Sequence, residues 1–214
     1  MSVYEHVVAS VEAGQLATVL AQAGTAGREA IARDGGRLFG LWKPLIGLSF
    51  NHVVAVVEWP QAQAPGRAPP LLLGNHPGVQ VVQNDVWQAT LRPAPGKIIR
   101  HDPGFVTHRW YDIEAVNLPK FLELTSNTWG NWEGQHDGEV LGLWRSLTLP
   151  HPTQHPERIR MRLMAWYRSM SVWENARHWK GTKGAETANS NLGARYDLTL
   201  DSAVSILQPA LPAP

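Results

Sequence analysis

The chain has 214 residues, enough for one good-sized domain or two small ones. Its 43% hydrophobic content excludes a disordered or fibrous protein, because such a chain can bury a core. The absence of cysteine excludes a disulfide scaffold, a thiolate nucleophile and cysteine-ligated metal sites. Since 19 Lys and Arg balance 18 Asp and Glu without a basic tract, we expect no nucleic-acid partner.

An internal repeat organises the chain. A shift of 102 positions places His6–Trp42 on His108–Trp144 without a gap, and nine of the 37 aligned positions are identical. The identities fall on periodic apolar positions and on glycines, so they indicate two copies of one unit. The two predicted domains are residues 1–102 and 103–214, each a ferredoxin-like repeat, the second with a Pro-rich tail.

The first copy is predicted to begin with a strand at 3–8 and an amphipathic helix marked by Leu16, Val19, Leu20 and Ala23. Strands at 37–45 and 51–59 follow the glycines that end this helix. The Pro-rich segment 60–70 is predicted to be a spacer outside the core.

The second copy repeats this order, with strands at 105–111, 139–149 and 159–167 and a helix capped by Asn117. Each copy then has a segment with room for a second helix and a strand, and residues 208–214 read as a frayed tail. The order β-α-β-β predicts the α+β class, as two ferredoxin-like repeats whose antiparallel sheets cover each other's bare faces.

The segment Gly36–Trp59 resembles the NIPSNAP family. It has the glycine-aromatic strand, the Ile46-Gly47 turn, Asn51 and an apolar strand that ends in tryptophan. In the second copy, His108-Arg109-Trp110-Tyr111 is similar to the family's Arg-x-Tyr strand. The resemblance implies a dimeric α+β barrel, here an intrachain pseudo-dimer around a small cavity. That superfamily includes cofactor-free oxygenases, isomerases, cyclases and haem enzymes.

Three residues of one predicted strand are the candidate catalytic group. His108 recurs as His6 in the first copy and would be the acid–base group, because histidine titrates near neutral pH. Arg109 and Tyr111 share a strand face and would hold an oxyanion if that face lines the cavity. The alternative is a backbone-bonded histidine and an arginine packed along the sheet surface.

The candidate substrate-binding residues are tryptophans and cationic side chains. The recurrent Trp42 and Trp144 have core packing as their favoured role, but a small barrel also lines its cavity with aromatic residues. Trp166 and Arg162 lie on a cationic, aromatic strand face, a pattern that is also typical of an exposed sheet edge, which we favour. His52 shares a strand face with Glu58, where solvent-facing strand ends are the favoured alternative.

The preferred function is a small-molecule enzyme that acts on an apolar or aromatic metabolite by metal-free acid–base chemistry, as an isomerase, lyase or cofactor-independent oxygenase. No zinc, Walker, dinucleotide-binding or nucleophile-elbow motif is present, which favours a protein without cofactor. The alternatives are a non-catalytic binding or scaffold protein and, third, a haem-binding barrel.

Because the start of the chain lacks a signal-peptide pattern and no apolar run could span a bilayer, we expect a cytoplasmic protein without a membrane partner. A homo-oligomer is compatible with this expectation.

Overall fold

The computed structural model describes residues 2–60, 66–99, 104–148, 156–176 and 186–210, and gives no side-chain placement for residues 186–190. Its eight strands are β1 (Val3–Val11), β2 (Arg37–Ile46), β3 (His52–Trp59), β4 (Val79–Arg92), β5 (Phe105–Glu114), β6 (Gly138–Ser146), β7 (Arg158–Tyr167) and β8 (Thr199–Pro209). Its longer helices are α1 (Leu16–Gln22), α2 (Arg28–Arg33), α3 (Ala68–Leu73), α4 (Leu118–Gln135), α5 (Met170–Asn175) and α6 (Glu186–Asp197). A π-helical stretch, Ala23–Gly27, joins α1 to α2, and a short turn, Ala115–Asn117, precedes α4.

The strands form one closed barrel in the order β1-β3-β2-β8-β5-β7-β6-β4. Within it, each half has the ferredoxin-like order, β4-β1-β3-β2 and β8-β5-β7-β6, and all pairings are antiparallel. The barrel closes where β2 pairs with β8 and β4 with β6, so the two sheets face each other as predicted. The predicted boundary at 102/103 falls outside the described residues.

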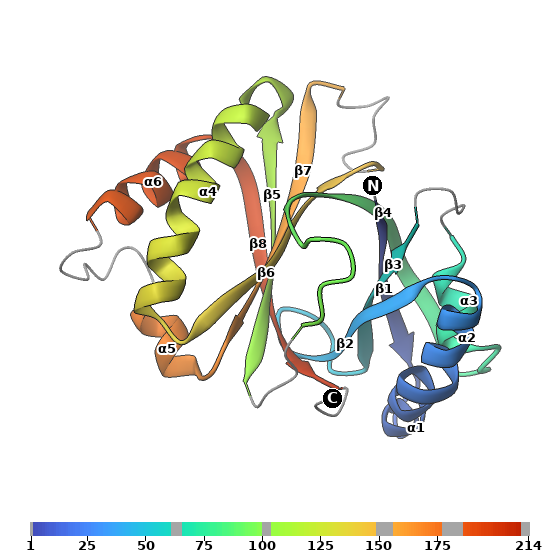
Figure 1. Cartoon of the computed structure of the whole chain (residues 1–214). Coiled ribbons are helices and arrows are strands. Elements are labelled where there is room, and N and C mark those ends of the chain that lie inside the picture. Colours follow the sequence, from blue (N-terminus) through green and yellow to red (C-terminus); the bar gives the residue numbers. More distant parts are fainter. Residues whose placement is uncertain (1, 61–65, 100–103, 149–155, 177–185, 211–214) are drawn as a thin grey trace.

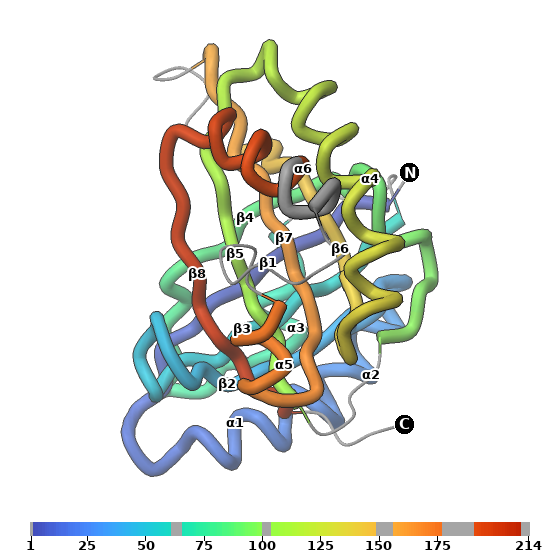
Figure 2. The backbone as a smooth tube through the Cα atoms, turned by 90° about the vertical axis from the view of Figure 1, so that its left-hand side faces the viewer, coloured from blue at the N-terminus to red at the C-terminus, as the bar shows by residue number. Residues whose placement is uncertain are grey.

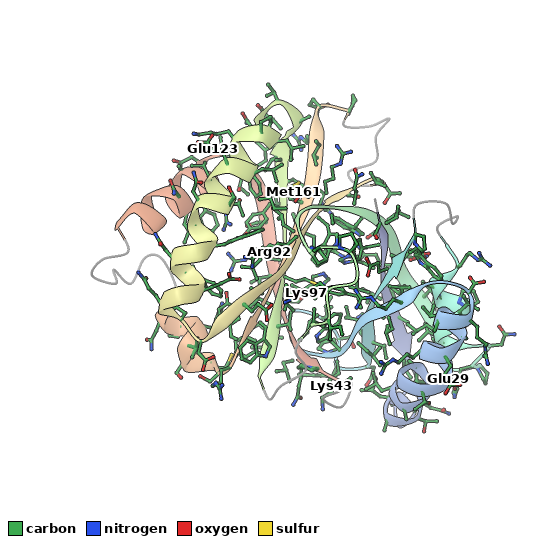
Figure 3. All side chains as sticks on the ribbon, viewed as in Figure 1. Glu29, Lys43, Arg92, Lys97, Glu123 and Met161 are labelled. Atoms are coloured by element: carbon green, nitrogen blue, oxygen red, sulfur yellow. The ribbon has the colours of Figure 1, made fainter. Side chains whose placement is uncertain are left out.

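Helices cover the two outer sides of the barrel. In Figure 1, α4, α5 and α6 lie against the C-terminal strands, and α1, α2 and α3 lie against the N-terminal strands on the opposite side. Viewed from the side of α4 and α6, the N-terminal strands run behind the C-terminal ones and at an angle to them (Figure 2). Glu29 on α2 and Glu123 on α4 point away from the sheets into solvent (Figure 3). No described helix has the length and apolar character to cross a membrane.

Buried side chains form three clusters because side chains alternate across a strand. One cluster lies between the N-terminal sheet and its helices and a second between the C-terminal sheet and its helices. The third fills the barrel interior, which we call the lumen, and includes Trp42, Trp87, Trp144 and Trp166. The lumen is therefore largely packed with indole rings.

The repeated glycines, Gly40 and Gly142, leave space for the ring of the tryptophan two residues later. A Cβ on Gly40 would lie 2.1 Å from the Trp42 ring, and one on Gly142 would lie 2.2 Å from the Trp144 ring. The strand register also shifts at both glycines. The shared Gly-Leu-Trp motif thus lets each indole fold back over its own strand toward the lumen.

Two predictions about loops are wrong. The end of the predicted 60–70 spacer is core, because Ala68 and Pro69 are buried at the start of α3. The predicted tail is also structured as far as residue 210. Pro209 pairs with Trp42, and the Ala210 amide donates to the Leu41 carbonyl at 2.9 Å, which helps to join β8 to β2.

Candidate functional site

Strand β5 separates two chambers. Residues with even numbers, such as His108, face the lumen, whereas Arg109 and Tyr111 face α4 and α6. The predicted catalytic group is therefore split, since adjacent residues of a strand point to opposite faces. His108 and Arg109 cannot act on one substrate atom from these positions.

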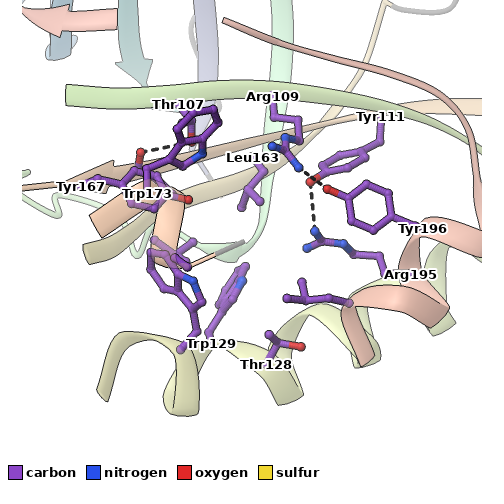
Figure 4. Close-up of a pocket in the computed structure, with 15 residues that line it drawn as sticks. Thr107, Arg109, Tyr111, Thr128, Trp129, Leu163, Tyr167, Trp173, Arg195 and Tyr196 are labelled. Atoms are coloured by element: carbon purple, nitrogen blue, oxygen red, sulfur yellow. Dashed lines mark hydrogen bonds between the residues drawn. The ribbon is translucent and has the colours of Figure 1, made fainter. Parts of the chain in front are cut away.

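A pocket of about 80 Å³ lies between the outer face of the C-terminal sheet and helices α4, α5 and α6. We call it the helix-side pocket (Figure 4). Its walls are rich in aromatic and cationic side chains, including three of the protein's four tyrosines and three of its ten tryptophans. Among the residues that line it are Arg109, Tyr111, Trp129, Trp132, Tyr167, Trp173, Arg195 and Tyr196.

Two arginine–phenol contacts cross the pocket. Arg109 donates to the hydroxyl of Tyr196, and Arg195 donates to the hydroxyl of Tyr111 at 3.1 Å. The Arg195 guanidinium also lies 5.1 Å from the centre of the Tyr111 ring, within cation–π range. Figure 4 shows the two guanidinium groups and the two phenols meeting at one end of the pocket.

The pocket carries positive charge without a matching carboxylate. Among the described residues, no Asp or Glu forms an ion pair with Arg109 or Arg195. The Arg195 residue is only 4% exposed, and its Nε atom is buried without a hydrogen-bond partner among the described residues. A buried, uncompensated cation is costly, so this arrangement suits an anionic ligand.

The surroundings of Arg109 keep its guanidinium group charged by raising its pKa. Burial alone lowers the pKa of Arg109, but the phenols of Tyr111 and Tyr196 outweigh it and raise that pKa above its usual value. Burial raises the pKa of Tyr167 to about 12, against the lowering effect of Arg109. At neutral pH the pocket therefore combines the cation of Arg109 with the neutral phenol of Tyr167.

The corresponding space in the N-terminal half is filled. Arg109 and Tyr111 correspond to Val7 and Ala9, which pack in the apolar cluster beneath α1, α2 and α3. Strand register also matches Tyr167 to Trp59, since Val3 pairs with Trp59 and Phe105 with Tyr167. Polar groups thus replace apolar ones at equivalent positions of one half only, which favours a role in binding over a role in packing.

The predicted substrate-binding residues lie mainly in the lumen. Trp42, Trp144, Trp166 and Arg162 are buried there, so the expectation of an exposed face for Arg162 and Trp166 is wrong. The sheet is closed into a barrel, so these two side chains lie inside it rather than on an open sheet face. His52 is half-buried at the start of β3. Glu58, at the far end of β3, is 6% exposed and pairs with Arg37, so it does not face solvent either.

His6 and His108 stack on each other within the lumen, with ring centres 5.6 Å apart. Arg162 lies beside them, and its Nη1 is 3.1 Å from Nδ1 of His6. Burial, followed by the charge of Arg162, lowers the pKa of each histidine well below the usual value. Both imidazoles are therefore neutral at pH 7. In the described part of the chain, no three His, Asp or Glu side chains converge in a way that could hold a metal ion.

Sequence reasoning missed Arg195 and Tyr196, which α6 brings to the pocket from 84 and 87 residues away along the chain. No local motif marks them. The repeat did contain a usable signal, because the change from Val7 and Ala9 to Arg109 and Tyr111 places polar groups on a strand face that is apolar in the first copy.

No protein-family model matches the chain, and no curated protein does. Solved structures do resemble it. A provisionally assigned monooxygenase from Lactobacillus acidophilus has a TM-score of 0.63 and 9% identity, over 99% of this chain and 95% of that one. An anthrone oxidase-like protein has a TM-score of 0.55 and 7% identity, over 97% and 91%. A mutant chlorite dismutase from Candidatus Nitrospira defluvii has a TM-score of 0.56 and 7% identity, over 98% and 92%.

The chain therefore has the dimeric α+β barrel fold, with both barrel halves in a single chain. At such low identity the likeness shows the fold alone. The resemblance to NIPSNAP proteins stays a prediction.

Proposed function

We propose that this protein is an enzyme that binds an aromatic small molecule as its anion in the helix-side pocket, in a reaction of the cofactor-independent oxygenase type. The observation that carries the proposal is the pair Arg109 and Arg195 in an aromatic pocket, with no described carboxylate to neutralise them. Trp129, Trp132 and Trp173 supply apolar walls suited to a planar ring system.

The pocket promotes ionisation by stabilising the product of deprotonation. A phenol or enol that enters it meets two guanidinium groups in a site largely removed from water, which lowers the pKa of the ligand. No His, Asp or Glu is among the described lining residues, so the proton leaves to solvent as the anion binds. This replaces the acid–base role predicted for His108, which faces the lumen.

An electron-rich anion of this kind can be oxidised directly by O₂. For an anthrone, the ring CH₂ loses its protons and becomes a carbonyl, one oxygen atom of O₂ is incorporated and the other leaves as water. The solved structures provisionally assigned as a monooxygenase and described as anthrone oxidase-like support this choice of reaction over isomerisation or elimination.

A resident haem fits the pocket poorly. Its described lining offers phenols but no His, Met or Cys as an axial ligand. Burial raises the pKa of Tyr167 to about 12, which disfavours the phenolate that iron would need. We therefore derive no step through haem, although a chlorite dismutase shares the fold.

Spectroscopy and product analysis test the proposal together. A chromogenic naphthol titrated with protein at a pH below its own pKa should develop the absorbance of its ionised form. In air, anthrone should give the quinone with uptake of one O₂ per molecule. Both signals should fall at least tenfold in Arg195→Met and persist in His108→Gln, the matched control on the lumen side of β5.

The outcomes separate the alternatives. An ionised ligand without product or O₂ uptake would support the non-catalytic binding protein. A Soret band on addition of haem, lost in Tyr167→Phe, would support the haem protein. No spectral change with any aromatic anion would contradict a binding role for this pocket.

A further inference from the structure

A second cavity, of about 150 Å³, lies in the lumen beside the β2–β3 loop. We call it the lumen pocket. It lies on the opposite face of β5 from the helix-side pocket, and it is reached near β8, where Ala203 is exposed. The residues that line it include Gly47, Gln83, His108, Trp110, Arg160 and Arg162.

Arg162 is a buried cation that forms no ion pair within the described part of the chain. It is 5% exposed, it contacts Nδ1 of His6 at 3.1 Å, and its guanidinium lies 4.3 Å from the centre of the Trp87 ring. No described Asp or Glu forms an ion pair with it, although Asp85 is close enough to oppose the effect of burial, which lowers the pKa of Arg162 to about 10. The side chain therefore stays charged at neutral pH.

Arg160, two residues before Arg162 on β7, does have a carboxylate partner. Arg160 also lines the lumen pocket, but both of its contacts with the Asp112 carboxylate are 2.7 Å long, and it stacks 4.2 Å from the centre of the Trp110 ring. Its charge is neutralised within the fold. Of the two arginines, Arg162 is consequently the one without an ion pair among the described residues, with the buried Asp85 carboxylate acting on it from a longer distance.

His108 adds an unused polar atom. The residue is 7% exposed, it lines the cavity, and its Nε2 has no hydrogen-bond partner. Because an arginine can only donate, Nδ1 of His6 must accept from Arg162, which places the His6 proton on Nε2. Buried polar atoms are normally satisfied, so Nε2 of His108, at the wall of a cavity that Arg162 also lines, leaves a hydrogen-bonding position open to a ligand.

We propose that the lumen pocket binds a small oxyanion, of the size of a short carboxylate, between Arg162 and His108. A guanidinium matches the two oxygens of a carboxylate, and a neutral imidazole with its proton on Nε2 can donate a further hydrogen bond. The Trp110 indole lines the cavity, and its volume of about 150 Å³ limits the space to a small ligand. This site is independent of the aromatic-anion chemistry proposed for the helix-side pocket.

The test is isothermal titration of the full chain with formate, acetate, nitrate and inorganic phosphate at constant ionic strength. We expect saturable binding of at least one of these anions with one site per chain. Affinity should fall at least tenfold in Arg162→Met and in His108→Gln. Arg109→Met, on the other face of β5, should bind as the native protein does.

A further variant keeps the proposal testable if Arg162→Met or His108→Gln fails to fold. Ala203→Phe fills the opening at β8 and keeps every charge, so it should also abolish binding. Binding that survives both Arg162→Met and Ala203→Phe would overturn the proposal, as would the lack of saturable binding by native protein at tens of millimolar anion. Because Arg195→Met affects only the helix-side pocket, loss of naphthol ionisation there with intact oxyanion binding would separate the two sites.

Discussion

At the scale of single residues, some arginines are buried at positions where their charge adds little to the stability of the fold. Arg37 and Arg160 are neutralised by Glu58 and Asp112, whereas Arg162 and Arg195 are buried without a described carboxylate partner. A buried charge without an ion-pair partner costs free energy, and an apolar side chain of similar size avoids that cost. The retention of two such charges, each in its own pocket, therefore argues for ligands rather than for stability.

This reasoning makes a prediction for Arg195. The Arg195→Met variant should unfold at the same temperature as the native protein or a higher one, while its affinity for an aromatic anion falls at least tenfold. Differential scanning calorimetry and fluorescence titration measure the two effects separately. Equal losses of stability and affinity would instead identify Arg195 as a structural residue. Arg160→Met is the matched control, because it breaks the ion pair with Asp112 and should destabilise the fold.

At the scale of elements, the Gly-Leu-Trp motif holds β2 and β6 against the lumen. Gly142→Ala should lower the free energy of unfolding by about 1–3 kcal/mol, because the new methyl group overlaps the Trp144 ring. Gly134→Ala on α4 is the control. A Cβ there meets nothing within 4 Å, so this change should stabilise the helix by up to about 1 kcal/mol. Urea denaturation distinguishes the two, and equal stability of both variants would contradict the role of the motif.

The elements and their order could be predicted from the sequence because the repeat carried the periodic apolar positions and the glycines of both copies. The alternation of apolar and polar residues could not show which face of β5 lines the lumen, since both faces carry buried side chains in a closed barrel. Consequently His108, Arg109 and Tyr111 were predicted to act together, although alternation along the strand places His108 opposite the other two. Arg195 depends on the packing of α6 on α4, which no local pattern encodes.

At the scale of the whole molecule, the closed barrel buries both repeated histidines in its interior, and this couples the stability of the fold to pH. Burial lowers the folded-state pKa of His6 and of His108, whereas in the unfolded chain each has an ordinary pKa near 6.5. As pH falls below 6.5, the unfolded chain binds protons that the folded chain does not. The free energy of unfolding therefore falls with decreasing pH, by at most about 1.4 kcal/mol per pH unit for each histidine.

Urea denaturation between pH 7.5 and 5.5 should show this slope in the native protein. It should be roughly halved in His108→Gln and smallest in the double variant His6→Gln/His108→Gln. His136, whose pKa burial also lowers, accounts for part of what remains. The carboxylate of Glu58 does not interfere in this range. Burial raises its pKa, but the hydrogen bonds and charge of Arg37 lower it by more, so its contribution to stability is lost only at more acidic pH.

A slope that stays unchanged in the double variant would show that these histidines have the same pKa in the folded and the unfolded chain. The stacked histidines would then not be the neutral, buried pair that the barrel encloses.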